Sequence, residues 1–165
     1  MELKWMGRYR ELVRALIYYS NSSNRGMFKK TLSPVNGIAL SKPEYQILEY
    51  LCEFDNENKI MADIAHDLGI IPSIVTKSTK TLVGYGLAER YHIAGNRKNI
   101  ILKPTQAGRK MYIDCYTGDI EKLFIPFFNA LDGLTDEQLK TFERAIYTLG
   151  TDWGALSDDL LQKID

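Results

Sequence analysis

The spacing of apolar residues predicts helices over most of the chain. In residues 8–20, apolar side chains recur every three or four positions, which is typical of one face of a helix. A long connection is expected next, because residues 21–40 are rich in Ser, Asn, Gly and Pro. Ser41 then suits a helix N-cap: Pro43 falls in the first turn, and Glu44 can complete a capping box.

Two shorter helices are predicted in the middle of the chain. Residues 59–69 form the first, and Gly69 is well placed to end it in the left-handed conformation. Pro72 then begins the second helix at its favoured first position. A helix, a tight turn containing glycine and another helix make the helix-turn-helix signature. The residues at core-facing spacing in the second helix are Val75, Ser78, Thr79 and Leu82.

After this pair the period changes from that of a helix to that of a strand. Apolar and polar side chains alternate over residues 87–93, and a second strand is expected over residues 99–103. The turn between them, residues 94–98, contains Gly and Asn and carries Arg97 and Lys98 at its tip. A helix-turn-helix followed by such a hairpin is a winged helix.

The remainder of the chain is predicted to be helical. Residues 105–131 form a long apolar run that we expect Gly118 and Pro126 to interrupt. Thr135 is the expected cap of a last helix, with Gln138 as its capping-box partner. The apolar stripe of this helix consists of Leu139, Phe142, Ile146, Leu149 and Trp153. The apolar surface of this stripe and of the stripe in residues 8–20 is larger than one winged helix can bury. We therefore expect a two-fold homodimer.

The outward face predicted for the second helix of the pair has an unusual composition. It carries Ser73, Thr76, Lys77, Lys80 and Thr81. Hydroxyl-bearing and β-branched residues are mediocre helix formers, so the surface that they create explains their presence better than helix propensity does. Short hydroxyls allow a helix to lie deep in a DNA major groove, and lysines neutralise phosphates. The alternative is an ordinary polar surface helix.

The charge of the chain is zero overall but unevenly distributed. Residues 72–110 carry eight basic side chains and one acidic side chain, a net charge of +7. Residues 111–165 carry four basic and eleven acidic side chains, a net charge of −7. A basic segment of this size indicates a phosphate-binding surface, although a solvated basic face is the simpler alternative. Arg90, on the first predicted strand, belongs to this segment.

The sequence carries only weak signals for metal binding, redox chemistry or catalysis. His66 and His92 have no Cys or His partner at a ligand spacing, which disfavours a zinc site. Cys52 and Cys115 lie in apolar stretches and are expected to be buried reduced thiols, with a disulfide or redox switch as the alternative. A phosphate-binding loop, a dinucleotide-binding glycine pattern and a nucleophile elbow are all missing from the sequence. We therefore expect a protein that is not an enzyme and needs no cofactor or metal.

The length and the termini bound the class of protein. A chain of 165 residues fits one domain with extensions. It contains no apolar run of membrane-spanning length, and its first ten residues lack the features of a signal peptide. The expected location is the cytoplasm.

Two stretches resemble the MarR family of bacterial regulators, and the order of predicted elements is similar over nearly the whole chain. The stretch IAHDLGIIPSIVTKSTKTLVGYGLAERY resembles the helix-turn-helix and first wing strand of that family. The stretch GNRKNIILKPTQAGRKM resembles its wing tip, second strand and following helix. The resemblance implies a mainly α fold: a winged helix-turn-helix over residues 41–107, with a two-stranded wing, and dimerisation helices over residues 1–40 and 108–165.

The resemblance also implies a function and a set of DNA contacts. A homodimer would place one recognition helix in each major groove of a palindromic operator, with a wing arginine in the flanking minor groove, and would act as a repressor. The implied DNA-binding residues are Ser73, Thr76, Lys77, Lys80, Thr81, Arg90, Arg97 and Lys98. Three positions depart from the family pattern: Asn96 replaces an Asp, Pro104 replaces a Leu, and Ile71 replaces the Ser that caps the recognition helix.

A small-molecule effector is the last expectation that the resemblance raises. The terminal parts of the chain are rich in aromatic residues, which suit a flat apolar or phenolic ligand but equally suit a dimer core. The candidate pocket residues are Tyr18, Tyr19, Phe28, Tyr112 and Tyr116. Two other functions stay open: a winged-helix module for protein interaction, and a cysteine-based redox-sensing regulator.

Overall fold

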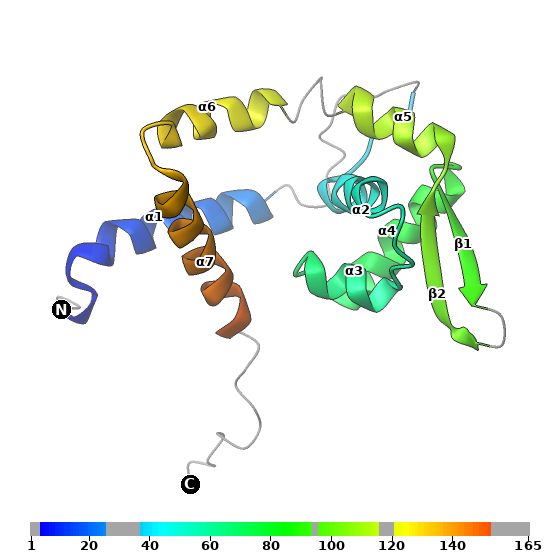
Figure 1. The fold of residues 1–165 in the computed structure, drawn as a ribbon, viewed down its shortest axis with the longest axis horizontal. Coiled ribbons are helices and arrows are strands. Elements are labelled where there is room, and N and C mark those ends of the chain that lie inside the picture. Colours follow the sequence, from blue (N-terminus) through cyan, green and yellow to red (C-terminus); the bar gives the residue numbers. More distant parts are fainter. Residues whose placement is uncertain (1–3, 26–36, 94–95, 116–120, 153–165) are drawn as a thin grey trace, which may run out of the picture. The chain divides into compact units, whose positions relative to one another are not determined.

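The computed structural model describes residues 4–25, 37–93, 96–115 and 121–152 (Figure 1). The chain divides into two compact units, Met1–Gly118 and Asp119–Asp165. The first unit contains the helix-turn-helix and the wing, and the described part of the second contains two helices. Among the described residues, no helix has the length and apolar character needed to cross a membrane.

The first unit begins with a short 3-10 helix, η1 (Lys4–Tyr9), and continues as α1 (Arg10–Asn24). This confirms the helix predicted over residues 8–20, although α1 continues to Asn24, into the stretch predicted as a connection. No residue of α1 is buried, and Tyr9, Leu12 and Tyr19 of the predicted stripe are exposed. The amphipathic face of α1 is therefore not packed into the core of the first unit.

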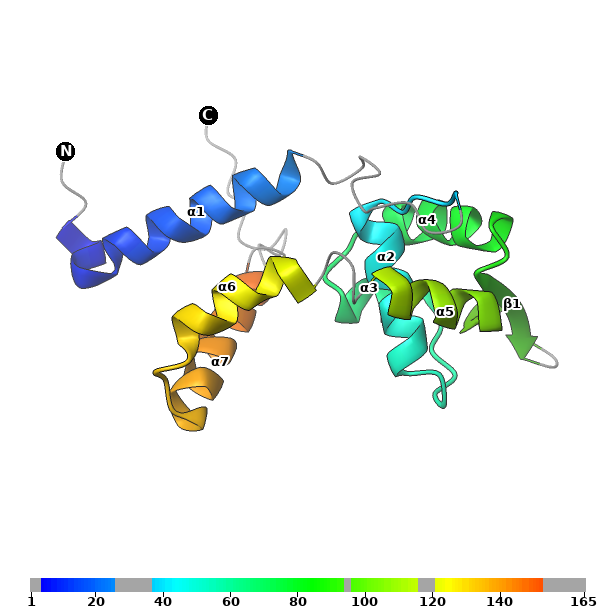
Figure 2. The same cartoon turned by 90° about the horizontal axis from the view of Figure 1, so that it is seen from above.

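Helix α2 (Lys42–Glu53) lies at the centre of the winged helix. It packs against α4 (Pro72–Gly84), α5 (Gln106–Cys115) and β2 (Asn96–Pro104), as Figures 1 and 2 show. Because it is covered on several sides, its apolar residues Tyr45, Ile47, Leu48, Tyr50 and Leu51 are all buried. Cys52, which we expected to be buried, is only half-buried. The predicted capping box is confirmed: the Ser41 amide donates to Glu44 Oε2 at 2.7 Å.

The helix-turn-helix consists of α3 (Met61–Asp67) and α4. Gly69 has φ of 60° between them, and the amides of Gly69 and Ile70 donate to the carbonyls of His66 and Ala65. This pair of bonds is the Schellman motif that ends many helices. The inward face predicted for α4 is confirmed in full, since its buried residues are Val75, Ser78, Thr79 and Leu82.

The wing is an antiparallel pair of strands, β1 (Ala88–Ile93) and β2. Strand β2 begins at Asn96, earlier than predicted, so the backbones of Arg97 and Lys98 lie in the strand and not in the turn. Leu87 and Ala88 are both buried, although alternation placed them on opposite faces. The chain enters the core at this point, with α4 packed against β1, before the strands extend outward (Figure 1).

Helix α5 starts with a tight set of contacts. Thr105 Oγ1 donates to the Gly86 carbonyl at 2.7 Å and accepts from the Gly108 amide at 3.0 Å. The Thr105 amide donates to the Leu87 carbonyl at 3.1 Å. A Cβ atom on Gly108 would lie 2.0 Å from that same carbonyl oxygen. Only glycine therefore allows the first turn of α5 to approach the start of the wing this closely.

The second unit contains α6 (Glu121–Leu131) and α7 (Asp136–Asp152). The predicted interruption at Pro126 is wrong: α6 continues through it, because a proline removes only one amide donor and the neighbouring turns hold. The other predicted interruption, Gly118, lies outside the described residues. The capping box at Thr135 is confirmed, with Gln138 Oε1 2.9 Å from the Thr135 amide.

Substituting Gly108 tests the close approach of α5. We expect Gly108→Ala to lower the free energy of unfolding by about 1–3 kcal/mol, because the new methyl group displaces the helix from the Leu87 carbonyl. The matched control is Gly84→Ala near the end of α4, where nothing lies within 4 Å of the added Cβ. Gly84→Ala should raise the free energy of unfolding by about 0.5–1 kcal/mol, because alanine is a better helix former than glycine. Urea unfolding followed by circular dichroism measures both, and equal stability of the two variants would contradict this packing.

Candidate nucleic-acid interface

The outward face of α4 carries the predicted side chains. Ser73, Thr76, Lys77 and Lys80 are exposed, and Thr81 is partly exposed. The opposite face of the helix is buried against α2 and α3. The structure thus brings these five residues together on one solvent-facing surface, the α4 face.

Two hydroxyls on the α4 face are already engaged as donors. Thr76 Oγ1 donates to the Pro72 carbonyl at 3.0 Å, and Thr81 Oγ1 donates to the Lys77 carbonyl at 3.3 Å. Each oxygen keeps lone pairs that can accept a hydrogen bond. These bonds fix the side chains, so the face presents acceptors and methyl groups in defined positions.

Three basic side chains of residues 72–110 bind other residues of the same chain. Lys103 Nζ donates to the backbone carbonyls of Asp55 and Glu57, at 2.5 and 2.9 Å. Arg109 Nη2 lies 2.9 Å from Asp55 Oδ2, and Lys110 Nζ lies 2.9 Å from Asp114 Oδ2. Lys103 and Arg109 fasten the loop after α2 to the wing and to α5. The basic surface available to a partner is therefore narrower than the net charge of +7 suggested.

The wing contributes Arg90, which is exposed on β1 and pairs in register with Leu102. His92 is also exposed, opposite Ile100. The side chains of Arg97 and Lys98 lie outside the described part of the chain. Glu89 is the acidic residue of this segment, and it accepts a hydrogen bond from Tyr91 Oη at 2.5 Å, which raises the pKa of the Tyr91 hydroxyl.

The helix-turn-helix is held in shape by a polar cluster that the sequence did not reveal. Tyr50 Oη on α2 donates to Asp67 Oδ2 at 2.5 Å, and Lys59 Nζ lies 3.7 Å from the same oxygen. Burial, followed by the hydrogen bond to Asp67, raises the pKa of Tyr50 to about 12. Hydrogen bonds from His66 and Tyr50 lower the pKa of Asp67. This cluster joins the end of α3 to α2 and so stabilises the position of α3 in the helix-turn-helix.

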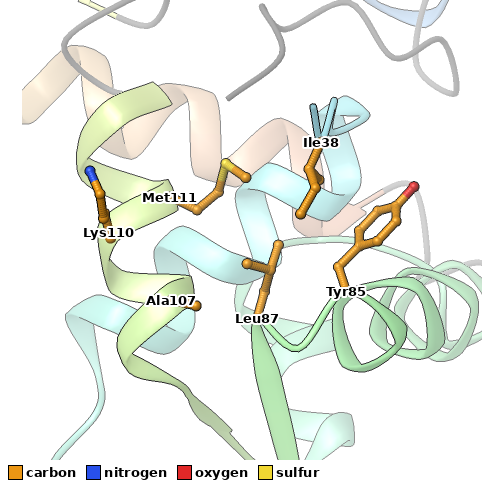
Figure 3. A pocket seen from close by; sticks show the side chains of 6 residues that line it. All are labelled: Ile38, Tyr85, Leu87, Ala107, Lys110 and Met111. Atoms are coloured by element: carbon orange, nitrogen blue, oxygen red, sulfur yellow. The ribbon is translucent and has the colours of Figure 1, made fainter. Parts of the chain in front are cut away.

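The candidate effector residues are not gathered into one pocket in the described residues. Tyr18 and Tyr19 are exposed on α1, whereas the Tyr112 ring on α5 lies 6.2 Å from that of Tyr45 on α2. Phe28 and Tyr116 lie outside the described residues. A separate small pocket of about 130 Å³ lies between α5, the end of α4 and the segment before α2 (Figure 3). It is lined by Ile38, Tyr85, Leu87, Ala107, Lys110 and Met111.

The thiol of Cys52 is poorly suited to redox chemistry. Burial raises its pKa to about 11, so the thiolate that reacts with oxidants is scarce at neutral pH. The side chain of Cys115 lies outside the described residues. Within the described ranges, no three His, Cys, Asp or Glu side chains are grouped so as to hold a metal ion.

Comparison with known proteins identifies the fold. No protein-family model matches the sequence. An HTH-type transcriptional regulator of Bacillus subtilis (strain 168), YhjH, is 28% identical over 123 residues, covering 73% of this chain and 67% of that protein.

Solved structures with the same arrangement are transcriptional regulators. BldR from Sulfolobus solfataricus has a TM-score of 0.63 at 19% identity, covering 90% of this chain and 99% of that one. ZitR from Lactococcus lactis, a zinc-responsive MarR family member, has a TM-score of 0.57 at 19% identity. The match covers 87% of this chain and 98% of ZitR. MepR from S. aureus, in a complex with DNA, has a TM-score of 0.59 at 14% identity. The match covers 88% of this chain and 96% of MepR. The chain therefore has the winged helix-turn-helix fold of MarR family regulators, as the sequence resemblance predicted.

The raised pKa of Cys52 gives a direct chemical test. In a Cys115→Ser variant, we expect Cys52 to react slowly with iodoacetamide at pH 8 and the rate to rise until the pH approaches about 11. Unfolding in urea should restore the reactivity of an ordinary thiol. Rapid alkylation of the folded protein with a midpoint below pH 8 would instead support the redox-sensing alternative.

Proposed function

We propose that the chain is a transcriptional repressor that binds double-stranded DNA sequence-specifically, as a homodimer on a palindromic operator. The observation that carries the proposal is the division of α4 into a buried face, formed by Val75, Ser78, Thr79 and Leu82, and an exposed face of lysines and short hydroxyls. A helix anchored in this way can enter a major groove without losing its packing.

The proposed contacts divide into two kinds. Lys77, Lys80, Arg90, Arg97 and Lys98 would neutralise phosphates and supply most of the affinity. Ser73, Thr76 and Thr81 would meet base edges in the major groove, and Arg97 on the wing would reach the flanking minor groove. MepR, which shares the fold, has been solved in a complex with DNA, and this supports DNA binding by analogy.

The uncovered apolar faces support a homodimer. On α6, Phe124, Ile125, Phe127 and Phe128 are between 41% and 56% exposed, and α1 exposes Leu12, Ile17 and Tyr19. Several large apolar side chains exposed on one helix, as on each of these two, usually mark an interface. A second copy, with the same helices, would cover it and place two α4 faces roughly one DNA turn, about 34 Å, apart.

Control by a small aromatic or phenolic ligand is a further part of the proposal. The exposed aromatic side chains Tyr18 and Tyr19 would suit such a ligand once a second copy supplies the other wall. The pocket of about 130 Å³ near Leu87 is smaller than the roughly 300–1,000 Å³ typical of ligand sites. To release DNA, the ligand must prefer a dimer geometry that misplaces the α4 faces.

The two alternatives receive less support. A winged helix that binds proteins would expose large apolar side chains along the α4 face, where this chain has mainly lysines and hydroxyls. A cysteine-based redox sensor requires a thiol of lowered pKa, and burial raises that of Cys52.

The salt dependence of DNA binding tests the assignment of the basic residues. Using a mixed-sequence duplex and fluorescence anisotropy, we expect Lys80→Ala and Arg97→Ala each to weaken binding and to reduce the salt slope by roughly one per subunit. The matched control is Lys103→Ala, because Lys103 already donates to two backbone carbonyls. It should lower stability but leave the slope unchanged. A normal slope for Lys80→Ala, or a reduced slope for Lys103→Ala, would contradict the proposed interface.

Sedimentation velocity tests the homodimer. We expect the wild-type chain to sediment as a dimer at micromolar concentration and the double variant Phe124→Glu, Phe128→Glu to dissociate, because it places charges in the apolar face of α6. Lys122→Glu, an exposed polar position on the same helix, is the control and should remain dimeric. A monomeric wild-type protein would rule out the two-fold binding mode.

A further inference from the structure

We propose that Ile71 is a specificity-determining residue: its side chain contacts the C5-methyl group of a thymine and selects an A·T pair at the start of the recognition helix, α4. The inference rests on the proposed DNA-binding function and adds to it a base preference and a residue that imposes it. Ile71 was noted in the sequence only as a missing helix cap.

Ile71 is exposed and rigidly held. Its side chain is 61% accessible to solvent, although it is large and apolar. Its backbone is extended, with φ of −64° and ψ of 142°, and its carbonyl accepts hydrogen bonds from the amides of Ile74 and Val75. Pro72 restricts it further, and β-branching limits its side-chain rotamers. The preceding turn is fixed by the Ile70–Ala65 backbone bond. Little conformational entropy would therefore be lost on contact with a base.

The location of Ile71 distinguishes it from an ordinary exposed apolar residue. Isolated residues of this kind are common on protein surfaces and need no explanation. Ile71, however, is the N-cap of α4, next to Pro72 and Ser73 on the end of the helix that leads into the proposed groove. Residues that favour this position, such as Ser or Asp, would cap the helix, whereas Ile provides no side-chain hydrogen bond.

The residues next to Ile71 leave apolar contact as the means of base discrimination at this end of the helix. The thymine methyl is the apolar group that base edges present in the major groove. The hydroxyl hydrogen of Thr76 is donated to the Pro72 carbonyl, so its oxygen can accept from the amino group of either adenine or cytosine and does not by itself select a base pair. The first turn of α4, residues 72–75, contains no Arg, Lys, Asn or Gln, the residues that form bidentate contacts with guanine or adenine. Apolar contact thus becomes a principal source of discrimination there.

Replacing thymine by uracil removes the methyl group alone and tests the contact. A duplex is first selected from a random pool by the wild-type protein, and each thymine is then replaced singly by uracil. We expect one position in each half-site at which uracil raises the Kd of the wild type about fourfold, as the loss of one buried methyl contact predicts. Ile71→Ala should bind thymine and uracil equally at that position, whereas Ile71→Val should retain the preference.

Ile71→Ser separates base reading from folding. Serine can accept a hydrogen bond from the helix amides, so this variant should have a higher Tm than the wild type while losing the thymine preference. If Ile71→Ala and Ile71→Ser both discriminate thymine from uracil as the wild type does, the inference is overturned although the DNA-binding proposal stands. If the wild type enriches no sequence from the pool, the proposed function itself fails and the inference falls with it.

Discussion

The packing of α4 onto α2 and α3 is the interaction on which the rest of the structure depends. Val75 and Leu82 fill the space beneath the helix, while the small side chain of Ser78 allows a close approach. Because this face is buried, the opposite face of α4 is directed outward, and its exposed residues include Ser73, Thr76, Lys77 and Lys80. The Schellman turn at Gly69 and the Tyr50–Asp67 hydrogen bond then hold the end of α3, and so the start of α4, in place.

The basic residues have two separate roles, which composition alone does not distinguish. Lys103 and Arg109 hold the loop after α2 against the wing and α5, so their charge maintains the fold. Lys80 and Arg90 project into solvent, where they can attract phosphates. A neutral chain can thereby offer a local positive surface, and the position of α4 within the unit determines where that surface lies.

Local patterns predicted much of the fold, because most elements here are defined by nearby residues. The inward face of α4, the capping boxes at Ser41 and Thr135, and the glycine turn at Gly69 all follow from spacing and residue type. Features set by distant contacts were missed. The Tyr50–Asp67 bond joins residues 17 apart in sequence, and Lys103 reaches carbonyls more than 40 positions away. The five residues of the α4 face were found because they share one helix, whereas the effector candidates are spread over separate segments.

The central claim is that the outward face of α4 reads DNA sequence in a two-fold symmetric complex. Sequencing the duplexes that the protein retains from a random pool, at near-physiological salt, tests it most directly. The account predicts enrichment of a palindrome whose half-site centres lie about 10 base pairs apart, rich in A·T pairs where the start of α4 lies. Retention of duplexes without any enriched sequence, or of a single asymmetric half-site, would contradict it.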